Sequence, residues 1–239
     1  MGYWLAPYYM LLASLDVVAA CIACYIVFRV GRLYARFKAS WLSFLLAGYA
    51  LLAIALIASA ISYGVATSEE FWHTPSMHPH GPSWRHGLTE WGYGIPPHWA
   101  YGAGGRGVSP FWVGVGALLL VSYVLILASV VTGRVEVEGL KIPEASSVAL
   151  GLLGLGVMVG LGLNVASVAI LLVAAALVIS GGRGVPSAGI GYLLLAVSHV
   201  LEVLAVQYLS ADLMLVAEGL RPVALLVIGV GVGVRGRHG

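Results

Sequence analysis

Long apolar runs, separated by short polar segments, divide most of this chain into predicted helices. A helix needs roughly 20 residues to cross about 30 Å of hydrocarbon. Such runs lie near residues 5–28, 41–63, 111–132, 146–162, 165–181, 189–209 and 212–234. The fourth and fifth runs are nearly continuous and too long together for one crossing, so a turn is expected at residues 160–164. The pattern predicts an all-α integral membrane protein: one domain, residues 1–239, of seven transmembrane helices.

Composition supports lipid as the main surroundings of the chain. Hydrophobic residues make up 60% of it, charged residues only 9%, and the mean hydropathy is +0.97. Soluble domains have about 25% charged residues. The formal net charge of +2 is small and scattered, which excludes a nucleic-acid partner. We therefore expect a multi-pass protein of the cell membrane, with the lipid bilayer and other membrane proteins as its partners.

The basic residues near the ends of the spans predict the orientation, because such residues are retained on the cytoplasmic side. An outer amino terminus places nine of them in the cytoplasm and three on or near the outer side. The cytoplasmic set is Arg29, Arg32, Arg36, Lys38, Arg134, Lys141, Arg183, Arg235 and Arg237, and the outer set is Arg85, Arg106 and Arg221. The carboxyl terminus is then cytoplasmic, and the loop 64–110 lies outside.

A weak internal similarity suggests a duplication. Shifting the chain by 148 positions sets residues 43–56 over 191–204, which would relate helices one to three to helices five to seven as a 3+1+3 parallel repeat. This topology resembles that of the SWEET sugar transporters, which are built from parallel repeats. The resemblance covers topology alone, since the chain has no proline–glutamine pair of the kind those proteins carry.

Five ionisable residues stand out well inside predicted spans, where each costs about 2.5–3.5 kcal/mol on insertion scales and normally finds a partner. They are Asp16, His199, Glu202, Glu218 and Arg221. His199 and Glu202 share one helix face, as do Glu218 and Arg221, because each pair is spaced three apart. Two hypotheses follow: an ion-pair cluster that locks helices one, six and seven, or a protonatable pathway or solute site. Haem is not expected, since His199 is the only histidine in any span.

The outer loop 64–110 is rich in histidine, tryptophan, glycine and proline. Histidine is the commonest metal ligand, and the Met-His-Pro-His sequence suits copper or another transition metal. The candidate ligands are Met77, His78, His80 and His86. The alternative is a surface that docks a partner or covers the bundle, carried by Trp72, Trp84, Trp91 and Trp99. We predict no other cofactor.

These observations leave two hypotheses for function. The first is a non-catalytic accessory or scaffold subunit of a larger membrane complex, for example one of electron transport. The second is a transporter of a small solute or metal ion that uses the five ionisable residues. No nucleophile elbow or metalloprotease spacing occurs, so the chain is not predicted to be an enzyme and no catalytic residue is assigned.

Overall fold

The computed structural model describes residues 5–72, 110–138, 161–180, 186–208 and 210–235. These residues form six helices, each with a segment long and apolar enough to cross a membrane, which confirms the prediction of an all-helical protein of membrane type. The helices are α1 (Leu5–Phe37), α2 (Ser40–Trp72), α3 (Pro110–Glu138), α5 (Leu161–Ser180), α6 (Pro186–Tyr208) and α7 (Ala211–Arg235).

The first two helices are longer than their apolar runs predict. α1 continues to Phe37 and ends where Lys38 takes the left-handed conformation, at φ 50°, and its N–H bonds to the carbonyl oxygen of Tyr34 at 2.8 Å. α2 continues to Trp72, so the first part of the segment predicted as an outer loop, residues 64–110, is helical. Hydrocarbon thickness sets how many residues must be apolar, but helix-forming polar residues extend a helix beyond that limit.

The predicted fourth helix, residues 146–162, lies almost entirely outside the described residues, so the count of seven stays a prediction. The predicted turn at 160–164 is wrong from Leu161 onward, because α5 begins there. Near the carboxyl end of α3, Arg134 bonds to the carbonyl oxygen of Leu177 and, at 3.2 Å, to the hydroxyl of Ser180 at the end of α5. α3 and α5 are therefore parallel, so the carboxyl end of α3 and the amino end of α5 lie at opposite ends of the bundle.

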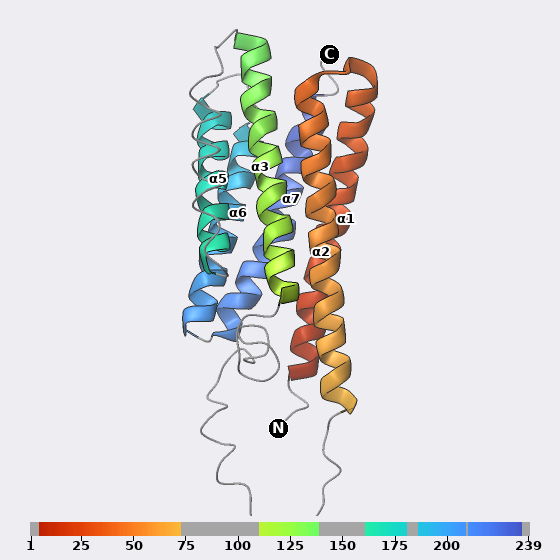
Figure 1. The fold of residues 1–239 in the computed structure, drawn as a ribbon, viewed down its shortest axis with the longest axis vertical. Coiled ribbons are helices and arrows are strands. Elements are labelled where there is room, and N and C mark those ends of the chain that lie inside the picture. Colours follow the sequence, from red (N-terminus) through yellow and green to blue (C-terminus); the bar gives the residue numbers. More distant parts are fainter. Residues whose placement is uncertain (1–4, 73–109, 139–160, 181–185, 209, 236–239) are drawn as a thin grey trace, which may run out of the picture.

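The described helices lie side by side in one bundle (Figure 1), and their packing partners follow a closed ring. Following the ring, α1 packs on α2, α2 on α3, α3 on α5, α5 on α6, α6 on α7, and α7 returns to α1. Packing is least extensive at two seams, between α1 and α7 and between α3 and α5. The ring therefore divides into two three-helix units: α1, α2 and α3 form the first unit, and α5, α6 and α7 form the second.

Two apolar clusters of different size fill the ring. The small apolar layer lies near the amino ends of α1 and α7 and consists of Tyr9, Leu12, Tyr63, Ala205 and Met214. The large apolar layer fills the opposite end of the ring and extends along α3 and α5 to Val115 and Ala166, near the amino ends of these helices. Its buried members include Ile26, Tyr49, Ile126, Leu171, Tyr192 and Ile228.

Two glycines let helices within each unit approach closely in the large apolar layer. A Cβ at Gly48 in α2 would lie 3.0 Å from the carbonyl oxygen of Ser122 in α3. A Cβ at Gly191 in α6 would lie 2.9 Å from the carbonyl oxygen of Ala224 in α7. Small residues permit this approach between membrane helices, so these contacts fix the spacing inside each unit.

Candidate functional site: a buried polar cluster

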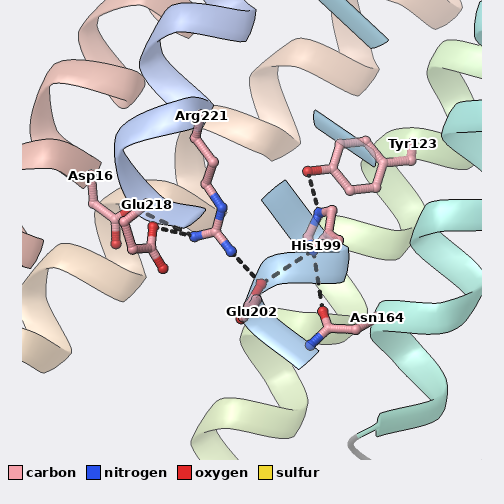
Figure 2. A network of polar contacts seen from close by, with 7 residues as sticks. All are labelled: Asp16, Tyr123, Asn164, His199, Glu202, Glu218 and Arg221. Carbon is pink, nitrogen blue, oxygen red and sulfur yellow. Dashed lines mark hydrogen bonds and ion pairs between the residues drawn. The ribbon is translucent and has the colours of Figure 1, made fainter. Parts of the chain in front are cut away.

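A group of polar side chains converges inside the ring (Figure 2). Along α1, α2, α6 and α7 it lies between the two apolar layers. We call it the polar cluster. Its members are Asp16 of α1, Tyr123 of α3, Asn164 of α5, His199 and Glu202 of α6, and Glu218 and Arg221 of α7. Ser59 of α2 adjoins it, so all six described helices contribute a side chain. The cluster lies in the half of the ring that contains the amino ends of α1 and α7.

Arg221 holds the centre of the cluster. Its Nη1 donates to Oε2 of Glu218 at 2.6 Å, and its Nη2 donates to Oε2 of Glu202 at 2.6 Å. The spacing of three residues along α7 brings Glu218 onto the same face, whereas Glu202 approaches from α6. Charge-assisted hydrogen bonds of this length are strong, so Nη1 and Nη2 of the guanidinium are both bound to carboxylates.

His199 is fully buried and both its ring nitrogens have partners. Nε2 lies 2.9 Å from the hydroxyl of Tyr123, and Nδ1 lies 3.2 Å from both Oδ1 of Asn164 and Oε2 of Glu202. A neutral ring with its proton on Nδ1 satisfies this set, because Nε2 then accepts from the tyrosine while Nδ1 donates. The histidine therefore needs no charge of its own in this arrangement.

Asp16 is the least satisfied member of the cluster. Its side chain is 1% exposed, and neither of its oxygens has a hydrogen-bond partner of standard geometry among the described residues. Its Oδ1 lies 3.7 Å from Nη1 of Arg221, too far for a hydrogen bond. The side chains of Ser59 and Glu218 are its other polar neighbours.

The cluster is unbalanced in charge. Three carboxylates, Asp16, Glu202 and Glu218, surround one guanidinium, and His199 is satisfied as a neutral ring. Burying a charge without a partner is costly, so such a group is usually neutralised by a proton or by a bound ion. Glu202 is the most accessible of the three carboxylates, with 18% of its side chain exposed. The arrangement can therefore accept a positive charge, as a proton, a cation or a cationic group of a solute.

The structure brings together the five ionisable residues singled out from the sequence, while their role stays a prediction. Sequence reasoning missed Tyr123, Asn164 and Ser59. Tyr123 inside an apolar run was a visible signal, whereas Asn164 was assigned to the predicted turn at residues 160–164. Both nitrogens of His199 are engaged, so haem ligation would require breaking these contacts.

The outer-loop candidates fall outside the described residues. These are Met77, His78, His80, His86, Trp84, Trp91 and Trp99, while Trp72 is the last residue of α2. Within the described part of the chain, no group of three or more His, Cys, Asp or Glu side chains is placed to hold a metal ion. The copper hypothesis for the loop stays a prediction.

Comparison with known proteins gave no match: no family model, no curated protein sequence and no solved structure matches the chain.

Proposed function

We propose that this protein is a membrane carrier, which moves a small solute or cation through the polar cluster. This is the second of the two functions expected from the sequence. The observation that carries it is the excess of buried carboxylates over the single guanidinium of Arg221.

A purely structural lock does not account for this composition. An ion pair that only fastened helices would be balanced and fully hydrogen-bonded, because each uncompensated buried charge opposes folding. Asp16 contributes a carboxyl group that makes no hydrogen bond of standard geometry, and Leu or Asn there would avoid the cost. The carboxyl group of Asp16 lowers stability in this conformation. Its presence is better explained by a second conformation of the protein, in which it binds a solute or ion or has moved to other partners.

The ring also supports a carrier because its weakest seams separate two similar units. Gly48 and Tyr49 of α2 correspond to Gly191 and Tyr192 of α6. Each glycine lies against a carbonyl oxygen of the next helix in its own unit, and the two tyrosine hydroxyls meet at 3.2 Å across the ring. This register differs from the one expected from the sequence, which set Ser43 on Gly191.

The first helices of the two units correspond as well. Asp16 lies in the sequence Leu-Asp-Val in α1, and Asn164 lies in Leu-Asn-Val in α5. Both side chains belong to the polar cluster. A parallel repeat whose two copies meet at a central site is typical of carriers in which one half rocks against the other.

In this proposal the two apolar layers are gates on either side of the site. Rocking at the α1–α7 and α3–α5 seams would open the small apolar layer and close the large one, then the reverse. The proposed topology has seven spans with the amino terminus outside, so the small apolar layer faces the exterior and the large one the cytoplasm. The excess of basic residues at the other end of the spans supports this orientation.

Glycines on the outer face of a helix would suit packing against another subunit. Gly229 and Gly231 of α7 do not lie on such a face, so they give no support to the complex-subunit hypothesis. A Cβ at Gly229 would lie 3.5 Å from Cγ1 of Ile26 in α1, and Gly231 is buried inside the ring. Mass measurement after gentle detergent extraction separates the two hypotheses: the carrier is expected to be stable without other kinds of chain, whereas a subunit would be recovered with its partners.

Side-specific labelling tests alternating access. Ile26 in the large apolar layer and Met214 in the small one are each changed to Cys, in a background where Cys21 and Cys24 are Ala. Both replacements are large-to-small and lie in α1 and α7, next to the seam between the units. In proteoliposomes a membrane-impermeant maleimide should label Met214→Cys from one side of the membrane only and Ile26→Cys from the other side only.

Asp212→Cys is the matched control, because Asp212 is exposed in the first turn of α7 and should be labelled throughout. If Asp212→Cys is labelled while both buried positions stay unreactive in the folded protein, the ring does not open and the carrier proposal is wrong.

A further inference from the structure

Asp16 faces polar groups from every helix packed against α1. On α2 these are the hydroxyl groups of Ser59 and Tyr63, and on α7 they are Glu218 and Arg221. Glu202 of α6 approaches through Arg221. Only one of these groups carries a positive charge, and its hydrogen bonds go to Glu218 and Glu202 rather than to Asp16.

The facing carboxyl groups of Asp16 and Glu218 present a specific problem. Both are almost fully buried and both lie near Nη1 of Arg221. This nitrogen is 2.6 Å from Oε2 of Glu218 but 3.7 Å from Oδ1 of Asp16. Two ionised carboxylates in such proximity repel each other, and carboxyl pairs in buried sites commonly share one proton. A proton on the pair removes one negative charge and supplies the donor that the oxygens of Asp16 lack.

We propose that Asp16 and Glu218 together bind one exchangeable proton, which the carrier takes up and releases as its two units move. This rests on the proposed function and names the ion that is coupled to transport. No other reactant is needed: the proton passes from water to a carboxylate oxygen, where an O–H bond forms, and it returns to water when that bond breaks.

A proton fits this position better than a metal cation does. Hard cations take many oxygen ligands, about 6–8 for Ca²⁺, whereas a proton needs only one donor oxygen and one acceptor. Among the described residues, the polar side chains near Asp16 that carry oxygens are Glu218, Ser59, Tyr63 and Glu202, and no group of three or more His, Cys, Asp or Glu side chains is placed to hold a metal ion. The equivalent residue of the second unit, Asn164, has the shape of a protonated aspartate and no charge.

Infrared spectra of the purified protein test the proton directly. At neutral pH, wild type should show the C=O stretching band of a buried carboxylic acid, which shifts in D₂O and disappears as the pH is raised. Asp16→Asn should lack this band, while Asp212→Asn should keep it, because Asp212 is exposed. The proposal is overturned if wild type shows no such band at any pH, or if added NaCl at fixed pH removes the band as a competing cation would.

Thermal melting provides a second readout. As pH rises and the proton leaves, the facing carboxylates repel, so the melting temperature of wild type should fall. Asp16→Asn mimics the protonated state and should melt at the same temperature or higher, with a flatter alkaline limb, and Glu218→Gln should flatten it likewise. Equal slopes in all three proteins would contradict a shared proton.

The two proposals fail separately. If Met214→Cys and Ile26→Cys show alternating access but no carboxylic acid band exists, the chain is a carrier whose coupling ion is not held by this pair. If the band is present but neither cysteine reacts, the pair binds a proton in a ring that does not open, and the carrier proposal is the one that fails.

Discussion

Two buried polar contacts join opposite sides of the ring, and they differ in chemistry. In the large apolar layer, the hydroxyls of Tyr49 and Tyr192 meet at 3.2 Å and carry no charge. In the polar cluster, four ionisable groups gather around Arg221, and Asp16 is left without a hydrogen bond of standard geometry. The tyrosine pair shows that this fold can join its two units at little electrostatic cost. Holding the two units together therefore does not by itself explain why this cluster is charged.

The energetic difference between the regions is large. Each charged residue in the hydrocarbon costs about 2.5–3.5 kcal/mol on insertion scales, whereas a neutral hydroxyl that finds a partner adds about 0.5–1.5 kcal/mol of net stability. We therefore expect removal of the guanidinium from the polar cluster to have a larger effect on unfolding than removal of a hydroxyl from the large apolar layer.

The largest effect is expected from Arg221→Leu. This change leaves Glu202 and Glu218 without the donor that each contacts at 2.6 Å. Removing one partner of a buried pair typically costs about 3–5 kcal/mol. The melting temperature in detergent should drop sharply. Arg32→Leu is the control, since Arg32 is exposed and its guanidinium lies over the ring of Phe28. Equal melting of wild type and Arg221→Leu would show that the guanidinium does not hold the cluster together.

A smaller effect is expected from Gly191→Ala in the large apolar layer. The added Cβ would lie 2.9 Å from the carbonyl oxygen of Ala224, so α6 and α7 must separate. Overpacking of this kind costs about 1–3 kcal/mol. Gly219→Ala is the matched control, because a Cβ there meets nothing within 4 Å, and Ala is favoured over Gly in a helix by about 1 kcal/mol. The melting temperature should therefore fall in the first variant and stay unchanged or rise in the second.

The smallest effect is expected for the tyrosine pair. Tyr192→Phe removes a neutral contact of 3.2 Å, which is long for two hydroxyls, so the cost should be about 1 kcal/mol, the low end for an unpaired buried group. Tyr49→Phe with Tyr192→Phe should recover much of the loss. A double-mutant cycle by thermal melting measures this coupling. If Tyr192→Phe lowered the melting temperature as much as Arg221→Leu, the expected difference in stability between the polar cluster and the tyrosine pair would be contradicted.

The amino-acid sequence determined the class of the protein and its polar candidates. Apolar runs predicted the six described spans, because hydrocarbon requires a minimum length of apolar helix. Helical spacing predicted that His199 and Glu202 share a face, and likewise Glu218 and Arg221. The predicted end of α2 was too early because polar residues that favour a helix continue past its apolar run. The predicted start of α5 was too late because its first residues, assigned to a turn, continue the helix.

Only the tertiary structure decided how those faces meet. The order of helices around the ring, with Gly48 and Gly191 fixing close approach inside each unit, brings Glu202 of α6 within hydrogen-bond reach of Arg221 and leaves Asp16 of α1 at 3.7 Å. It also joins His199 to Tyr123 across the ring. A sequence fixes which residues share a helix face, because that depends on local geometry. Which carboxylate receives the guanidinium depends on distances between helices, and these arise from packing among residues far apart in the chain.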